Sequence, residues 1–419
     1  MARCTTQRER RRGGIGLAAL IALPVVLLAF VVGLSSRQYR DIHTRMQAEA
    51  DASALAGVHI LAGDELLRGR LQSGMNNYAL YTLLQSGRLE VLKYAEQNPV
   101  FLNFSVPEWN TTTPTSGDIQ YGSYDRTLAT PFSPVPILDG MGVPSTNLHT
   151  INALKVYMRR SHDLNNAVPI PRMPIVGKGT VDASTVATAM LDGDLQGFRP
   201  LFADRPMRLV PVALDYATVA AATADDYAFN GNTNTFSMGS DNLPEIEVNL
   251  TTATMVVPTT AVSLNVGYTT APNIAQQIVN GTYAAQLTGA PFNGAFILQD
   301  AGGLPAKLKM AVPGQEFFSV GDGGTLEAAL GTLAMSPYTP RIFPLYEGVD
   351  GMGQPIIISF IAARVIAVAT TTDGMGDIDS IKLTLQPTLV SDPNAVTNTA
   401  FRGHVGVPNL TIAKLRLVP

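Results

Sequence analysis

The residue types best suited to chemistry are few in this 419-residue chain, and they are scattered along it. No two of the five histidines have the spacing of a metal-binding motif; they are His43, His59, His149, His162 and His404. The only cysteine, Cys4, lies near the N-terminus, so the rest of the chain has no thiolate and forms no internal disulfide. The HExxH, GxSxG and GxxxxGK[ST] motifs are also absent. The sequence therefore predicts no catalytic residue, no metal site and no cofactor.

Three short segments resemble reactive or ligand-binding motifs. Ser161-His162-Asp163 contains the residue types of a catalytic triad, but triad members come from separate elements, so we expect a turn. Asp373, Asp377 and Asp379 have the carboxylate density of a calcium loop without the spacing of an EF-hand, which favours a polar hairpin turn. Gly321–Gly324 precedes an expected helix, as phosphate-binding loops do, but no lysine follows. Nothing in these segments requires an enzyme.

The N-terminal region carries the strongest signal. A basic arm containing Arg8, Arg10, Arg11 and Arg12 leads into Ile15–Leu34, an uncharged and almost entirely apolar stretch. Twenty helical residues span about 30 Å, the thickness of the hydrocarbon core of a bilayer. A cleaved signal has a shorter apolar core and a small-residue cleavage site, neither of which is present. We therefore expect an uncleaved transmembrane helix in the lipid bilayer, with the arginines cytoplasmic and the bulk outside.

The helix is expected to continue beyond the membrane as a stalk, because Arg37–Leu61 contains no proline. Small residues recur there at three- and four-residue spacing: Met46, Ala50, Ser53, Ala54 and Gly57. This stripe could pack on a partner helix, including a second copy of the chain, or on the protein's own domain; the sequence favours neither. Asp64–Gln97 forms a second helical stretch, which Gly74 and Gly87 are expected to interrupt.

The chain after residue 98 is expected to be mainly β. Short apolar runs alternate with turn residues, for example Ala153–Met158, Met207–Leu214 and Glu245–Leu250. Helices are expected at Asn273–Asn280 and at Thr325–Leu333, where Thr325 could be the cap, and Ile356–Ala369 should pair with Ser380–Gln386. The predicted fold class is α+β, predominantly β. The expected segments are an arm (1–13), a transmembrane helix (14–35), a helical stalk (36–98) and two β-rich domains (99–222 and 223–419).

Charge is distributed unevenly along the chain. The arm to Arg12 holds five arginines and one glutamate, so the remainder carries 24 basic and 32 acidic residues, a net charge of −8. An acidic exterior without a basic cluster argues against nucleic acid as a partner.

The N-terminal segments RRGGIGLAALIALPVVLLAFVVGL and RMQAEADASALAG resemble the N-terminal module of TadG-like proteins of tight-adherence (Flp) pilus assembly. That module has a basic start, a glycine-led membrane helix with an internal proline, and a following motif LQ-x-x-x-D-x-A-A-L-A-G. The matching positions are Met46, Gln47, Asp51, Ser53, Ala54, Leu55, Ala56 and Gly57, with Met in place of Leu and Ser in place of Ala. The resemblance implies a non-catalytic protein of the bacterial inner membrane, with a periplasmic bulk and with pilin-like or pilus-assembly membrane proteins as partners.

Two alternatives remain open. A membrane-tethered domain could bind or hydrolyse polysaccharide or peptidoglycan, and hydrolysis would require two carboxylates facing each other about 5–5.5 Å or about 6.5–9.5 Å apart. The chain could also be a pilin-like filament subunit, although its large exported region argues against this.

Overall fold

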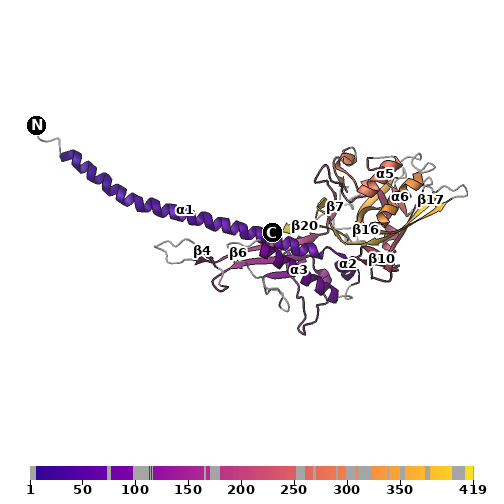
Figure 1. Ribbon diagram of the computed structural model, residues 1–419, viewed down its shortest axis with the longest axis horizontal. Coiled ribbons are helices and arrows are strands. Elements are labelled where there is room, and N and C mark those ends of the chain that lie inside the picture. Colours follow the sequence, from indigo (N-terminus) through magenta and orange to yellow (C-terminus); the bar gives the residue numbers. More distant parts are fainter. Residues whose placement is uncertain are drawn as a thin grey trace.

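The computed structural model describes residues 6–72, 77–97, 113, 115, 117–164, 167–169, 180–251, 260–267, 270–288, 291–298, 308–309, 322–337, 339–349, 354–372, 378–398 and 411–418. A long N-terminal helix leads to two β-rich units, so the coarser prediction of an α+β fold holds (Figure 1). The expected predominance of β structure does not, because helices and strands occupy similar shares of the described residues. We call the unit next to the helix the first unit and the other the second unit.

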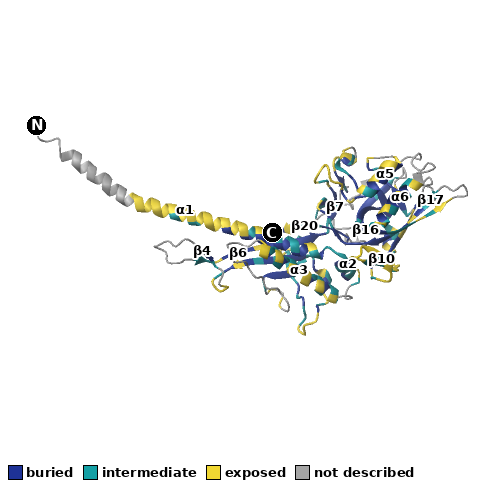
Figure 2. Cartoon of the chain, in the orientation of Figure 1, coloured by how far each residue is buried: buried dark blue, intermediate teal, exposed yellow. Residues whose placement is uncertain are grey.

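Helix α1 runs without interruption over 56 residues, Thr6–Leu61, with Pro24 inside it. Its course confirms that the helix continues beyond the apolar stretch. Figure 2 shows its two halves: the part from Ala22 to Asp41 is exposed almost throughout, whereas one face is buried from Ile42 onward. The same helix therefore projects from the molecule and enters its core.

Two further helices follow, α2 (Asp64–Leu71) and α3 (Asn77–Gln97). Gly74 lies outside the described residues, and the expected interruption at Gly87 is wrong because α3 passes straight through it. A Cβ atom at Gly87 would lie 2.7 Å from the Tyr121 hydroxyl oxygen and 3.1 Å from the Gly57 carbonyl oxygen. Glycine at this position thus allows α3 to approach α1 and the first sheet closely.

The first unit contains a six-stranded sheet. Its strand order is β18 (Val390–Ser391), β20 (Ile412–Val418), β6 (Ala183–Asp192), β3 (Ala153–Arg160), β1 (Ile119–Tyr124) and β2 (Phe132–Pro134). Side chains alternate across a strand, so Leu154, Val156 and Met158 of β3 point toward α1 and α3 and share their core. Lys155 and Tyr157 point to the opposite face, where the Lys155 ammonium lies over the Tyr157 ring.

The second unit contains a seven-stranded sheet that closes on itself. The order is β14 (Leu308–Lys309), β16 (Pro355–Thr372), β15 (Arg341–Val349), β8 (Val212–Asp215), β12 (Ala261–Ser263), β11 (Ile246–Thr251) and β17 (Ile378–Pro387), and β17 also pairs with β16. The first part of β16 pairs with β15 and its second part with β17, which completes a ring of six strands with β14 beside it. The expected pairing of Ile356–Ala369 with Ser380–Gln386 is confirmed.

Two short helices, α5 (Ala271–Asn280) and α6 (Asp322–Ala334), pack on this ring. A third, α4 (Tyr216–Ala220), directly follows β8. Their buried residues, including Ile274, Ile278 and Leu330, join the core of the ring. The expected cap at Thr325 is wrong, because α6 begins at Asp322 and Thr325 lies inside it.

Small elements complete the described structure. A three-stranded sheet has the order β13 (Phe296–Ile297), β7 (Leu195–Phe198), β19 (Ala395–Thr397). Two antiparallel pairs are formed by β9 (Tyr227–Asn230) with β10 (Thr235–Met238) and by β4 (Val168–Pro169) with β5 (Thr180–Val181). Short 3-10 helices occur at Leu148–Thr150 and Ala284–Leu287. The Met207–Leu214 run forms regular strand only from Val212.

The two sheets do not divide the chain at residue 222. Strand β8 precedes that position yet belongs to the ring, and β18 and β20 return from the C-terminal part of the chain to the first sheet. The expected division into 99–222 and 223–419 is therefore corrected: the second unit is inserted between strands of the first.

Helix α2 links the two units through side chains. The Asp64 carboxylate accepts hydrogen bonds from Arg364 and Thr388, at 2.8 and 2.6 Å. The Arg68 guanidinium donates to Asp241 at 2.8 Å. These contacts join α2, which follows α1 directly in the chain, to the second unit.

Candidate functional site

The candidate site predicted from the sequence lies in the docked segment of α1, the part from Ile42 onward that packs on the first sheet. The stripe residues Met46, Ala50, Ser53 and Ala54 are each at most 1% exposed, and Gly57 is buried with them. Met46, Ala50 and Ala54 belong to the same hydrophobic core as the first sheet. Of the two packing alternatives, the described structure therefore has the stripe on the protein's own domain.

Little space is left at Gly57. A Cβ atom there would lie 2.4 Å from Leu154 Cδ2 and 2.6 Å from Val91 Cγ2. Bulky residues at Ala54 or Gly57 would consequently disturb the first unit itself, which makes them unsuitable as probes of a partner contact.

The other motif residues lie at the edge of this interface. Gln47 Nε2 donates to Asp51 Oδ1 at 2.8 Å and to the Val186 carbonyl oxygen at 3.1 Å, so it bridges α1 and β6. Half-buried Leu55 packs against the core. Arg8, Arg10, Arg11 and Arg12 fall within α1, but their side chains lie outside the described part of the structure.

Two buried ionisable residues interrupt the mostly apolar contact. Glu49 of α1 is 4% exposed and Arg160 of β3 is 2% exposed, and the two interact electrostatically. Burial raises the pKa of Glu49 from 4.5 to about 7, although the positive charge of Arg160 opposes this rise. Burial likewise lowers the pKa of Arg160. Sequence reasoning missed this pair; the available signal was a glutamate on the buried face of the stripe, between Met46 and Ser53.

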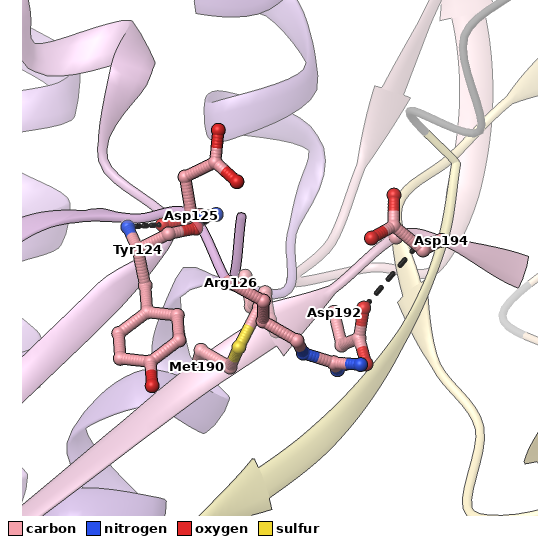
Figure 3. A pocket seen from close by; sticks show the side chains of 9 residues that line it. Tyr124, Asp125, Arg126, Met190, Asp192 and Asp194 are labelled. Carbon is pink, nitrogen blue, oxygen red and sulfur yellow. Dashed lines mark hydrogen bonds and ion pairs between the residues drawn. The ribbon is translucent and has the colours of Figure 1, made fainter. Parts of the chain in front are cut away.

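A polar pocket of about 340 Å³ lies at the end of the first sheet. It is lined by Tyr124, Asp125, Arg126, Asn152, Met190, Leu191, Asp192, Gly193 and Asp194 (Figure 3). Asp192 is fully buried; it forms an ion pair with Arg126, lies 3.6 Å from Arg416 Nη1 and accepts a hydrogen bond from Thr397 at 2.6 Å. Because Thr397 belongs to β19, this carboxylate ties the first sheet to the neighbouring small sheet.

Two of the pocket carboxylates make structural contacts. Asp192 is held by its cations, and Asp125 Oδ1 accepts from the Thr127 amide and hydroxyl, at 2.9 and 2.7 Å. Figure 3 shows the Asp125 side chain pointing away from Asp192. The contacts of Asp192 and Asp125 stabilise the junction at this end of the first sheet.

His162 contacts neither of its neighbours in the Ser-His-Asp segment. Its Nδ1 lies 2.6 Å from Asp182 Oδ1 and its Nε2 lies 2.5 Å from Thr180 Oγ1. This order of groups resembles a catalytic relay, although the His162 and Asp182 side chains are more than half exposed. The contacts instead connect the end of β3 to β5 and β6.

The remaining motifs contribute no described site. Residues 373–377 and Gly321 lie outside the described residues, so the calcium-like loop and the anion-binding loop remain untested expectations. Within the described residues, no group of three or more His, Cys, Asp or Glu side chains could hold a metal ion.

Comparison of the chain with protein-family models, curated proteins and solved structures finds no match.

Proposed function

We propose that this protein is a non-catalytic, membrane-anchored component of the bacterial cell envelope, which holds its β-rich units close to the outer surface of the inner membrane. The observation that carries the proposal is the division of α1. From Leu23 to Leu34 the helix exposes large apolar side chains, and from Ile42 it is built into a protein core. It is long and apolar enough to cross a membrane.

The exposed apolar half requires an environment other than water. Leu23, Val26 and Phe30 are each 63% exposed, and neighbouring residues of the helix are similar. A soluble protein rarely leaves such a surface uncovered, whereas a lipid bilayer would cover it on all sides. The arginine arm favours a cytoplasmic N-terminus.

The short spacing between the two halves supports close apposition to the membrane. Ile42 lies eight positions beyond Leu34, and at 1.5 Å per helical residue this corresponds to about 12 Å. The first unit would then lie next to the lipid headgroups, where it can meet other membrane proteins.

Pilus assembly of the tight-adherence type is the more specific part of the proposal, and the resemblance of the N-terminal module to TadG-like proteins supports it. Since the small-residue stripe is occupied, pilin-like or assembly partners would contact the membrane half of α1 or the exposed surfaces of the units. A homo-oligomer would have to use the same surfaces.

The experiment that tests anchoring uses the full-length protein in bacterial membranes. Resistance to alkaline extraction, an intact N-terminus and protease access only from the periplasmic side would support it. Release into the soluble fraction with a new N-terminus after the apolar stretch would overturn it.

Crosslinking in the same membranes, followed by mass spectrometry, tests the pilus role. Capture of pilin-like or pilus-assembly proteins would support it. A ladder containing this chain alone would favour the filament-subunit alternative, and hydrolysis of purified peptidoglycan would favour the enzyme.

A further inference from the structure

The contact between α1 and the first sheet contains polar atoms that lack partners. Glu49 Oε1, Ser53 Oγ and Thr185 Oγ1 are buried and make no hydrogen bond within the described part of the chain. Glu49 and Ser53 are one turn apart on the same face of α1, and Thr185 lies on the face of β6 that α1 covers. Together with Arg160, they form a polar cluster inside an apolar interface.

Such a cluster weakens the contact in which it lies. An unpartnered buried polar atom loses the hydrogen bonds that water would provide, and a buried charge loses hydration. Elsewhere the same interface consists of well-packed residues such as Ala50, Ala54 and Val58. The polar cluster is thus the point at which this interface most readily separates.

The cluster also lies at the membrane-proximal end of the docked segment. Beyond it, toward the membrane, only Met46 and Ile42 are buried among the described residues of α1. Opening this end would require few contacts to break, and the rest of the helix, from Ala54 to Leu61, could stay in place.

Arg160 is the charge that faces Glu49 from the sheet. On β6 and β20 the charged residues Asp192, Lys414 and Arg416 lie on the opposite face, by strand alternation. The buried face of α3 presents Leu84, Gly87, Val91 and Ala95. On α1 itself, Arg45 is exposed and pairs with Asp41 at 3.1 Å, and the Asp51 carboxylate binds Gln47.

We infer that Glu49 and Arg160 form a proton-operated latch, which sets how firmly the segment Ile42–Ser53 of α1 is held against the first sheet. The inference concerns a conformational equilibrium within the chain, and it holds whether or not the proposed pilus role is correct.

The direction of the pH effect follows from the raised pKa of Glu49. The docked state favours the neutral carboxyl, whereas an undocked, hydrated Glu49 would titrate near its ordinary value of 4.5. Docking is therefore firmest below pH 4.5 and weakens as the pH rises toward about 7. Above that value, Glu49 is ionised in both states and the dependence disappears.

Hydrogen exchange followed by mass spectrometry on the full-length protein in detergent micelles tests the latch. Amide exchange in residues 42–53 is measured from pH 5 to 8 and corrected for the intrinsic pH dependence of exchange. Protection should fall by up to about tenfold per pH unit between pH 5 and 7, and should then level off. Peptides from β16 report global unfolding and should not follow this change.

Two variants and one control sharpen the test. Glu49→Gln should abolish the pH dependence, and Arg160→Gln should move the fall to higher pH, because the attraction that opposes the rise in the Glu49 pKa is lost. Glu96→Gln, on the exposed side of α3, should behave as the wild type.

A pH dependence retained in Glu49→Gln, or none in the wild type, overturns the inference. The same dependence in the β16 peptides would overturn it too, because the opening would then be global. If Glu49→Gln fails to fold, the wild-type comparison of residues 42–53 with β16 still decides the matter.

Discussion

The two units complete their cores by different means. The ring of the second unit pairs its strands in a closed cycle, and its core residues come from those strands and from α4, α5 and α6 beside them. The first sheet is open and depends on α1 and α3 to cover one face. Eight buried core residues come from α1 and α2, among them Ile42, Val58 and Leu66. The first unit therefore depends on α1 to complete its core, whereas the ring does not.

Removal of the docked helix should have the largest effect. Deleting residues 1–61 removes Met46, Ala50, Ala54 and Val58 from the first core, so we expect the first unit to unfold while the ring persists. Deleting residues 1–36 removes only a part of α1 that precedes the docked segment, and should leave both units folded. Residue-resolved hydrogen exchange measures the outcome, and protected strands β3 and β6 in the longer deletion would contradict the comparison.

Gly57→Leu should destabilise the first unit by about 3 kcal/mol, at the upper end of the usual cost of overpacking, because the new side chain would overlap Leu154 and Val91. Gly33→Leu is the matched control, since nothing lies within 4 Å of its Cβ position. Denaturant unfolding in detergent, monitored separately for the two units by exchange, provides the measurement. Equal stability of the two variants would show that α1 is not packed as described.

Asp192→Asn should lower the free energy of unfolding by about 2 kcal/mol, within the range for hydrogen bonds to charged groups. The reason is that Arg126 and Arg416 would lose their buried counter-ion. Asp204→Asn, at an exposed position between β7 and β8, is the control. The loss should affect the first unit and β19 together, because Thr397 shares the carboxylate. Thermal unfolding of the two variants tests this, and a loss confined to the ring would be inconsistent with it.

The smallest effect is expected at the link between the units. Asp64→Asn weakens the contacts to Arg364 and Thr388 in the largely buried junction and should lower the free energy of unfolding by about 1.5 kcal/mol, the low end for hydrogen bonds to charged groups. Each unit should keep its own stability while their unfolding transitions become less coupled. Calorimetry of this variant against Glu65→Gln, which affects a contact within α2, distinguishes the two roles; identical profiles would remove α2 as the link.

The sequence predicted the local features well, because local patterns determine them. The apolar run to Leu34, the helix through Leu61 and the hairpin of β16 with β17 depend on residues close together in the chain. Gly87 was misread because its reason for being glycine, the approach of Tyr121 and Gly57, is visible only in three dimensions. The same limit concealed the return of β20 to β6 and the closure of the ring, since pairings between distant segments leave no mark in either segment alone.

The candidate site was predicted in part. The small-residue stripe was recognised, but its partner was left open, because small residues favour close packing without specifying against what. Arg160 and Asp192 could not be assigned, since a charged residue in a strand is ordinarily exposed and its burial depends on what covers it. Which carboxylates meet which cations is likewise a property of the assembled sheets.

Because α1 is continuous, the orientation of its exposed half about the helix axis fixes the orientation of its docked half. An α-helix turns by about 100° and rises about 1.5 Å for each residue, and no break separates the exposed half of α1 from the half docked on the first sheet. In the proposed membrane-anchored protein, the face of α1 that points to neighbours in the bilayer would therefore fix the direction in which the uncovered face of the first sheet points. One residue inserted near Arg37 would rotate the first sheet by about 100° around the helix axis. Seven inserted residues make close to two full turns, so they would restore the original orientation and move the units about 10 Å along the axis. Copies of the protein whose α1 helices pack in the same way would therefore hold their β-rich units in the same orientation and at the same distance from the bilayer.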